Sequence, residues 1–471
     1  MDAARRAPAP PRPVRRWLEF EGISRPKARP SASPEPPRWR RAAFLVPLAV
    51  LALAAGLRLW SLGSPSSTIM DEGYYVHDAE AYVGGQIDLS GAPRPSMALE
   101  DEVTWMHPPL GKYLIGLGDW PTVGTSWGWR LPSALFGIAG VWIVYLTGLA
   151  LWRSVWWAGL GAIMLALDGL HIVQSRAAML DVFLTTFVSA GFLFLVWDRT
   201  RGSSRAAAGG WIDRAFGGRY RLCAGAMFGL AIATKWSGAF ALLAAIALTA
   251  AGRGDAEGRG RRAATTATSF VAVPLLIYTA TYAQAFVEHG PNLILWLRLQ
   301  WDMARAQVQT PPVLSASRPL SWPLLLHPLQ YYPRYVLSTL QTHAPRQIWA
   351  FGNPVLWYGC LAAVPVAAWR AVRARDWRFG WILAFAGAMY LPWLATSRAE
   401  YLYYMTPVVP FMALLLAGVV RCIHPVRLAR GTAIGIAGAA AASAALYAPV
   451  WLGLTASIAW LARFHLPPRW P

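Results

Sequence analysis

At residues 131–151 the chain reads LPSALFGIAGVWIVYLTGLAL. This stretch contains no charged side chain and is long enough to cross a lipid bilayer as one helix. Similar apolar runs recur along the chain. They are the segments 42–60, 156–172, 178–197, 222–236, 238–251, 266–283, 353–369, 379–395, 402–420 and 432–461. The pattern predicts an all-α integral membrane protein with about eleven transmembrane helices.

The composition of the chain agrees with a membrane protein. Of its 471 residues, 56% are hydrophobic and 14% are charged, whereas a soluble domain carries about 25% charged residues. A mean hydropathy of +0.35 excludes a water-soluble enzyme of this size and a disordered protein. The net charge of +20 comes from basic clusters between the apolar runs, which indicates membrane topology and not nucleic-acid binding. The three cysteines are scattered and predict no disulfide framework.

The basic residues predict how the chain is oriented in the membrane. More than half of the 43 Lys and Arg residues fall in six segments, 1–41, 152–156, 198–221, 252–262, 370–378 and 421–430. Because such loops stay in the cytoplasm, we expect a cytoplasmic amino terminus and an extracytoplasmic carboxyl terminus. The small residues Ala54, Ala55 and Gly56 leave a cleaved signal peptide open as an alternative for the first run.

This orientation divides the chain into four parts. We expect a disordered basic cytoplasmic tail, a catalytic membrane core, a second outer loop and a carboxyl-terminal four-span bundle, over residues 1–41, 42–283, 284–350 and 351–471 respectively. The core contains a first long outer loop, 61–130. The second loop includes a Trp- and Leu-rich amphipathic stretch, Asn292–Ala306, which is expected to lie along the membrane surface.

Two adjacent carboxylates, Asp71 and Glu72, follow shortly after the first span. Near a bilayer the lower dielectric favours proton uptake by one member of such a pair, so the pair suits a general base. The alternative is a solvated pair at the start of a helix, where acidic side chains interact favourably with the helix dipole.

Cationic side chains are expected at the same surface. Arg130, Arg176 and Lys235 lie near the outer ends of predicted spans, and Arg398 lies in another short outer loop. Ionisable groups at this depth usually form pairs or mark a site. The alternatives are an ion pair between Arg176 and Asp181, and side chains of Lys235 and Arg398 that extend to the membrane interface.

The segment His107-Pro-Pro-Leu-Gly-Lys112 is a further candidate. Its two prolines fix an extended entry into a helix that begins near Lys112. Only three lysines occur in a chain that otherwise uses arginine, which indicates a specific role for this ammonium group. A plain junction between a loop and a helix is the alternative.

Together these segments predict an outer cleft with carboxylates on one wall and cations on another. Such a cleft suits a lipid-linked phosphate donor, because the cations hold the phosphate while a carboxylate activates the acceptor. The sequence has no zinc-type His/Cys spacing, no Walker loop and no dinucleotide-binding glycine motif. A cytosolic nucleotide-sugar donor is therefore not expected, no cofactor is expected, and a divalent ion is not required.

Six motifs in this order resemble the protein O-mannosyltransferases of the GT-C fold. The motifs are Asp71-Glu72, His107–Lys112, Arg130-Leu-Pro-Ser-Ala-Leu-Phe-Gly137, Arg176 with Met179-Leu-Asp181, Thr234-Lys-Trp-Ser-Gly238 and Tyr401-Leu-Tyr-Tyr-Met-Thr-Pro407. The resemblance runs from about residue 42 to 420. It implies transfer of mannose from a polyprenyl-phosphate-mannose carrier to Ser/Thr hydroxyls, with inversion at the anomeric carbon.

The resemblance also implies roles for individual residues. Asp71 would be the base and Glu72 would help to place the acceptor or donor, while Arg130, Lys235 and Arg398 would face the donor phosphate. The residues expected to support this site are His107, Lys112, Arg176, Asp181 and Tyr403.

The second outer loop is too short for the β-trefoil insertion of eukaryotic members, and Tyr403-Tyr404 stands where those members tend to have histidine. Both features point to the actinobacterial-type branch. Its acceptors are secreted proteins that emerge from the secretion channel at the plasma membrane.

Two other functions remain alternatives. A GT-C enzyme with a lipid or glycan acceptor, of the aminoarabinose-transferase type, would also carry an outer carboxylate and phosphate-binding cations. A lipid carrier or flippase without enzymatic activity would place polar residues through the centre of the bilayer instead.

Overall fold

The computed structural model describes residues 38–84, 106–122, 124–201, 211–251, 259–308, 316–332 and 346–457. Residues 1–37 of the expected tail, the part of the first outer loop at 85–105 and the end of the chain after 457 lie outside these residues. Residues 38–41, predicted as the end of the disordered tail, are helical and belong to the first helix.

In the described part of the first half of the chain, all regular elements are helices. They are α1 (Arg38–Leu59), α2 (Glu72–Gly84), α3 (Leu110–Asp119), η1 (Trp120–Thr122), α4 (Ser126–Trp152), α5 (Val155–Ala166), α6 (Gly169–Ser175), α7 (Leu180–Arg201), α8 (Trp211–Phe216), α9 (Arg219–Thr234) and α10 (Gly238–Ala250).

The second half adds one small sheet to further helices. Its elements are α11 (Arg259–Ala267), η3 (Thr268–Ala272), α12 (Val273–Ala280), α13 (Ala283–His289), α14 (Leu293–Val308), η4 (Pro319–Ser321), β1 (Leu329–Tyr332), β2 (Ile348–Ala350), α15 (Pro354–Val372), α16 (Trp377–Tyr390), η5 (Leu391–Ala395), η6 (Leu402–Val408), α17 (Val409–Val420) and α18 (Val426–Leu452).

Helix lengths support a multi-pass membrane protein. Within the described ranges, six helices are long and apolar enough to cross a membrane, or seven if the bent pair α5 and α6 is one span. Every one of the eleven predicted runs contains helix, but the remaining runs coincide with shorter helices such as α10 and α16. The count of eleven spans stays a prediction.

The predicted run 156–172 is broken in the structure. Helices α5 and α6 meet at an angle of 65°. Asp168 lies at the break, where its carboxylate accepts a hydrogen bond from the backbone N–H of His171 and caps α6. The same carboxylate accepts from the backbone N–H of Asn353 and from the indole of Trp357, each at 2.9 Å. The break is therefore fixed by hydrogen bonds to α15 and to the residue that precedes it.

A short β-ribbon and an isolated β-bridge between Arg346 and Thr455 are the departures from an all-α fold among the described residues. Strands β1 and β2 pair antiparallel, with Leu329 opposite Ala350 and Gln330 opposite Trp349. The ribbon belongs to the second predicted outer loop. The predicted amphipathic stretch 292–306 coincides with α14.

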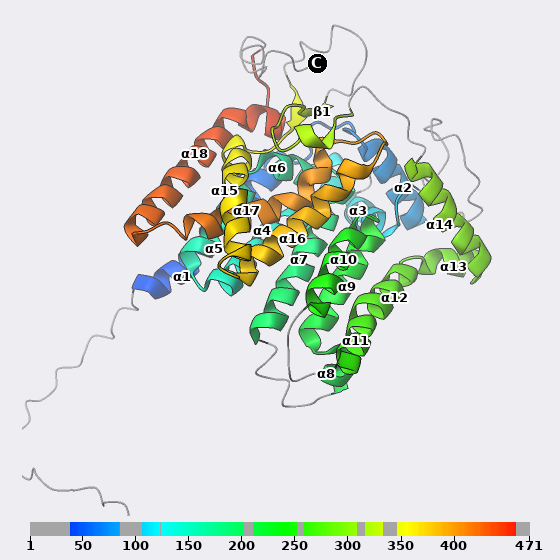
Figure 1. Ribbon diagram of the computed structural model, residues 1–471. Coiled ribbons are helices and arrows are strands. Elements are labelled where there is room, and N and C mark those ends of the chain that lie inside the picture. Colours follow the sequence, from blue (N-terminus) through cyan, green and yellow to red (C-terminus); the bar gives the residue numbers. More distant parts are fainter. Residues whose placement is uncertain are drawn as a thin grey trace, which may run out of the picture. The chain divides into compact units, whose positions relative to one another are not determined.

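The helices that carry the predicted motifs pack side by side. Helix α7 packs against α4 and α9, and α2 packs against α3 (Figure 1). The loop between α1 and α2, the start of α7 and the turn between α9 and α10 consequently meet at one end of these helices.

Candidate active site

Glu72 and Arg130 form a buried ion pair between α2 and α4. The Nε of Arg130 donates to Oε1 of Glu72 at 2.8 Å, and Nη2 donates to Oε2 at 2.7 Å. Glu72 also accepts from the backbone N–H groups of Ile69 and Ala178, at 2.9 and 2.8 Å. The pair therefore ties the loop before α2 both to α4 and to the segment before α7.

Arg130 has no hydrogen-bond donor left for a ligand. Its other N–H groups donate to the backbone carbonyls of Leu62, Pro65 and Ser67, and the side chain is fully buried. A guanidinium has five N–H donors, and here all five are engaged. The structure thus differs from the expectation that Arg130 faces the donor phosphate, because Glu72 and backbone carbonyls already surround it.

Arg176 caps the carboxyl end of α1. It does not pair with Asp181, so the alternative of an ion pair between these two residues is wrong. Its guanidinium donates to four backbone carbonyls of residues 57–61, the shortest contact being 2.7 Å to Trp60, and to the carbonyl of Leu452 at the end of α18 at 3.3 Å. The last carbonyls of a helix have no partner within the helix, so a buried cation is well placed there.

Asp181 pairs with Lys235 instead. The Nζ of Lys235 donates to both carboxylate oxygens of Asp181, at 2.9 and 3.0 Å, and both side chains are almost fully buried. The same ammonium lies over two aromatic rings, 4.7 Å from the ring centre of Tyr404 and 5.3 Å from that of Tyr403. Two of its three N–H donors are on Asp181, and the described hydrogen bonds leave the third available to a ligand.

Lys112 forms the second lysine pair of the site. Its Nζ lies 2.7 Å from Oδ2 of Asp78, and both side chains are fully buried. Because Asp78 belongs to α2 and Lys112 to α3, the pair joins the helix that follows Asp71 to the helix that follows His107. This pairing favours a structural role for Lys112, whereas the sequence indicated a specific role for its ammonium group.

Asp71 lies one residue before α2 and is half-buried. The hydroxyl of Tyr403 donates to its Oδ2 at 3.3 Å, while the ring of Tyr403 lies beneath the ammonium of Lys235. Burial raises the pKa of Tyr75 on α2 well above its usual value, and the negative charges of Asp71 and Asp181 raise it further. The structure thus brings Asp71, Tyr403 and the Lys235–Asp181 pair together.

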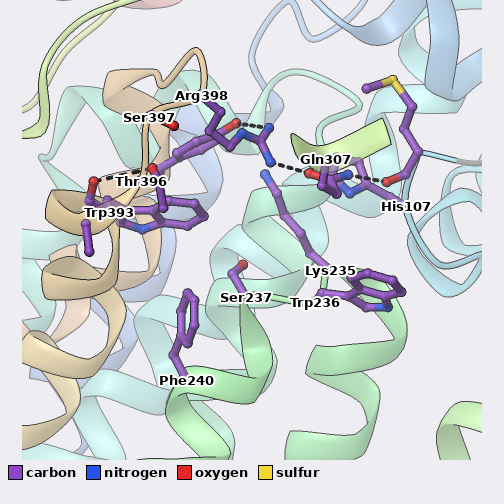
Figure 2. A pocket seen from close by; sticks show the side chains of 13 residues that line it. His107, Lys235, Trp236, Ser237, Phe240, Gln307, Trp393, Thr396, Ser397 and Arg398 are labelled. Atoms are coloured by element: carbon purple, nitrogen blue, oxygen red, sulfur yellow. Dashed lines mark hydrogen bonds between the residues drawn. The ribbon is translucent and has the colours of Figure 1, made fainter. Parts of the chain in front are cut away.

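A pocket of about 470 Å³ lies beside these residues. Aromatic, cationic and hydroxyl side chains line most of it (Figure 2). The lining residues are Met106, His107, Lys235, Trp236, Ser237, Phe240, Gln307, Trp393, Ala395, Thr396, Ser397, Arg398 and Tyr404. They include two cations and a histidine but no carboxylate, so the pocket has the composition of an anion site with an apolar floor.

Arg398 is held at the rim of this pocket by two side chains. Its Nη2 donates to the hydroxyl of Tyr404 at 3.0 Å, and its Nη1 donates to Oε1 of Gln307. Its Nε makes one long contact to the carbonyl of Ala399, at 3.5 Å. One N–H on each terminal nitrogen therefore has no partner in the described part of the chain, in contrast to Arg130.

His107 forms part of the pocket wall and lies 6.2 Å from the ring of Tyr75, centre to centre. Burial lowers its pKa well below the usual value, and the positive charges of Lys235, Lys112 and Arg398 lower it further. The imidazole is therefore neutral at pH 7. It is suited to hydrogen bonding and adds no third positive charge.

Several pocket residues were not among the residues predicted from the sequence. Gln307 lies one residue past the predicted amphipathic stretch, and Tyr404 lies next to the chosen Tyr403 within the same motif. Trp236 and Ser237 belong to the motif that supplied Lys235. The motifs therefore pointed to Tyr404, Trp236 and Ser237. No feature of the sequence pointed to Gln307.

The described residues contain no group of three or more His, Cys, Asp and Glu side chains that could hold a metal ion.

The arrangement of helices matches known membrane glycosyltransferases. The chain has a TM-score of 0.74 to the S. cerevisiae protein O-mannosyltransferase Pmt1–Pmt2 complex bound to the sugar donor, at 12% identity, covering 91% of this chain and 92% of that one. It has a TM-score of 0.55 to ArnT from Cupriavidus metallidurans bound to undecaprenyl phosphate, at 18% identity over 90% of this chain and 77% of that one. The fold is that of a GT-C membrane glycosyltransferase.

Sequence comparison defines the family. The family model described as dolichyl-phosphate-mannose-protein mannosyltransferase matches residues 48–288, and that of the C-terminal four TMM region of protein-O-mannosyltransferase matches 293–470. The chain therefore belongs to the dolichyl-phosphate-mannose-protein mannosyltransferase family, as the motifs predicted, and is a mannosyltransferase.

Actinobacterial relatives cover most of the chain. The polyprenol-phosphate-mannose–protein mannosyltransferase of Mycolicibacterium smegmatis is 29% identical in an alignment of 422 positions that covers 78% of this chain and 80% of that protein. The protein of the same name from Corynebacterium glutamicum is 28% identical in an alignment of 428 positions that covers 79% of this chain and 80% of that protein.

Proposed function

We propose that this enzyme transfers mannose from polyprenyl-phosphate-mannose to Ser/Thr hydroxyls of proteins at the outer face of the plasma membrane, with inversion. The observation that carries the proposal is the position of Tyr403. Its hydroxyl contacts Asp71 and its ring lies under Lys235, so one side chain lies between a carboxylate and an anion-binding cation.

The donor phosphate fits between Lys235 and Arg398. Together these side chains keep one ammonium N–H and two guanidinium N–H groups without a protein partner among the described residues. A phosphodiester offers acceptor oxygens to such donors, and the same contacts stabilise the charge that grows on phosphate as it leaves. The aromatic rings of Trp236, Phe240 and Trp393 provide an apolar surface for the adjoining isoprenoid carbon atoms.

Asp71 would act as the general base. Its carboxylate takes the proton from the acceptor hydroxyl while that oxygen forms a bond to the anomeric carbon of mannose. The bond from this carbon to the phosphate oxygen breaks, and its electron pair leaves with polyprenyl phosphate. Attack from the face opposite the phosphate inverts the anomeric configuration. Phosphate needs little protonation to leave, so the reaction requires charge stabilisation from Lys235 and Arg398 more than a separate acid.

Protein acceptors are supported by the names of the relatives, which are protein mannosyltransferases. A lipid or glycan acceptor is the alternative, because ArnT shares the fold. We place the amino terminus in the cytoplasm and the site outside on the charge distribution. This location suits polypeptides that emerge from the secretion channel.

Membranes that contain the full chain should move labelled mannose from polyprenyl-phosphate-mannose onto a Ser/Thr peptide. Asp71→Asn should lower this transfer by about 10²–10⁴-fold, because the amide keeps the shape but cannot accept the proton. Binding of polyprenyl phosphate to the purified variant should persist.

The matched control is Glu80→Gln, which removes an exposed carboxylate from α2, the helix that follows Asp71. It should transfer mannose at the wild-type rate. Near-normal transfer by Asp71→Asn would reject Asp71 as the base. Transfer to lipid or glycan acceptors without transfer to peptide would establish the alternative function.

A further inference from the structure

Gln307 connects two walls of the pocket. It lies in the last turn of α14, and its Nε2 donates to the backbone carbonyl of Met106 at 2.5 Å while its Oε1 accepts from Nη1 of Arg398. Figure 2 shows the amide between Arg398 and the His107 segment, with the side chain of Lys235 extending toward the same place. The neutral side chain of Gln307 thus links Met106, about two hundred positions before it, to Arg398 in the loop that follows α16.

Helix α14 is anchored well enough to hold this amide in place. Leu299 and Met303 are buried in a small cluster with Tyr278 and Tyr282. Gln300, two turns before Gln307, accepts a 2.5 Å hydrogen bond from the hydroxyl of Tyr278. Because α14 is fixed on α12 in this way, the position of Gln307 is set by packing at some distance from the pocket.

Arg398 depends on this contact for its orientation. It is half-buried, and its only other side-chain partner among the described residues is the hydroxyl of Tyr404. The backbone contact of its Nε is long, at 3.5 Å. Hydrogen bonds fix the direction of the planar guanidinium fork, so loss of one of the two side-chain partners leaves the orientation of Arg398 less defined.

The neutral amide also preserves the charge of Arg398. An amide oxygen occupies one N–H donor and leaves the full positive charge available to a ligand. A carboxylate at the same position would form a charge-assisted pair with Arg398 and would compete with an incoming phosphate. The chemistry of the position therefore favours glutamine over both apolar and acidic residues.

We propose that Gln307 is a positioning residue for the donor phosphate, which orients the guanidinium of Arg398 toward the pocket without neutralising it. This inference rests on the proposed function, since it takes a polyprenyl phosphate group as the ligand. Gln307 itself is assigned no contact with the reacting atoms.

The test compares Gln307→Met, Gln307→Glu and a matched control, Gln284→Ala, in the purified full chain. Gln284 is also an amide that links two segments, since it accepts from the hydroxyl of Tyr113 and donates to the carbonyl of Tyr82. It does not line the pocket. Gln307→Met keeps the length of the side chain but removes both hydrogen bonds.

Binding of labelled polyprenyl phosphate is measured directly, and KM is measured separately for the mannose donor and the peptide. Gln307→Met should weaken binding and raise the donor KM by roughly 10- to 150-fold, the range for loss of one charge-assisted contact. Gln307→Glu should weaken binding more. The peptide KM should not change in either variant, and Gln284→Ala should leave both KM values near wild type.

Equal changes in the donor and peptide KM, or wild-type binding by Gln307→Glu, would overturn the proposal. If Gln307→Met does not fold, Gln307→Glu alone decides, because it retains an acceptor for Arg398. The two proposals can fail separately. If the variants bind polyprenyl phosphate more weakly but the wild-type chain transfers no mannose to peptide, the role of Gln307 is supported and the proposed function is rejected.

Discussion

Glu72 and Asp71 are neighbours in the chain but have different surroundings. Glu72 accepts four hydrogen bonds and is fully buried, whereas Asp71 is half-buried and contacts Tyr403. A carboxylate with every acceptor position occupied by protein donors is poorly placed to take a proton from a substrate. We therefore assign Glu72 to holding the loop that presents Asp71.

Replacing Glu72 with Gln should destabilise the protein as well as lower its activity. The change leaves Arg130 buried without a counter-ion, which typically costs about 3–5 kcal/mol. Thermal unfolding of the detergent-solubilised protein should occur at a clearly lower temperature than in the wild type. Arg398→Met, at the half-buried rim cation, should leave the unfolding temperature nearly unchanged while raising the donor KM. Equal unfolding temperatures for Glu72→Gln and the wild type would contradict this assignment.

The pairing of Lys235 with Asp181 also bears on how the phosphate cation can be tested. Lys235→Met alone would leave Asp181 buried and unpaired, so a loss of activity would combine misfolding with the loss of a phosphate contact. The double variant Lys235→Met/Asp181→Asn removes both charges and is the better test of the lysine.

At the scale of elements, the close contact between α9 and α10 shapes the turn that carries Lys235. A Cβ added at Gly238, the first residue of α10, would lie 2.7 Å from the backbone carbon of Ala231 and 2.8 Å from the nitrogen of Ile232. Real Cβ atoms do not approach backbone this closely, and backbone within a helix cannot give way locally. Glycine is therefore required for α10 to begin directly beside α9.

Gly238→Ala should push α10 away from α9 and displace Lys235. Overpacking of this kind typically costs about 1–3 kcal/mol, so we expect both a lower unfolding temperature and reduced mannose transfer. Gly435→Ala on α18 is the control, because an added Cβ there meets nothing within 4 Å. The two variants should differ in transfer rate by more than their unfolding temperatures alone explain. Equal transfer rates and unfolding temperatures for the two variants would show that the turn tolerates displacement.

Across the whole molecule, the sequence predicted helices better than it predicted partners. Apolar runs such as 131–151 coincide with helices because a run of that length without charge has few other conformations in a bilayer. The pairing of Asp181 with Lys235 depends instead on how α7 and α9 pack. The spacing of residues along the chain gives no information about this packing. The same holds for Arg130, whose five donors are taken by residues 62–72, and for Gln307.

The orientation of the whole molecule gives the last prediction. A cysteine introduced at the exposed Ser66 should react with an impermeant thiol reagent added to intact cells, and one at the exposed Ala374 should not. The background would carry serine at Cys223 and Cys422, since the third cysteine, Cys360, is buried. Labelling at Ala374 without labelling at Ser66 would place Asp71 in the cytoplasm and overturn the proposed function.

The contact between Arg176 and Leu452 has a consequence for the timing of biosynthesis. Arg176 begins the segment whose Ala178 holds Glu72 and which leads to Asp181, yet one of its partners is a carbonyl at the end of the last described helix. A ribosome adds about 5–20 residues per second, so the nascent chain waits on the order of tens of seconds between making these two parts. During that interval Arg176 has its four acceptors at residues 57–61 but lacks the carbonyl of Leu452. Activity should therefore begin only when synthesis of the chain is nearly complete.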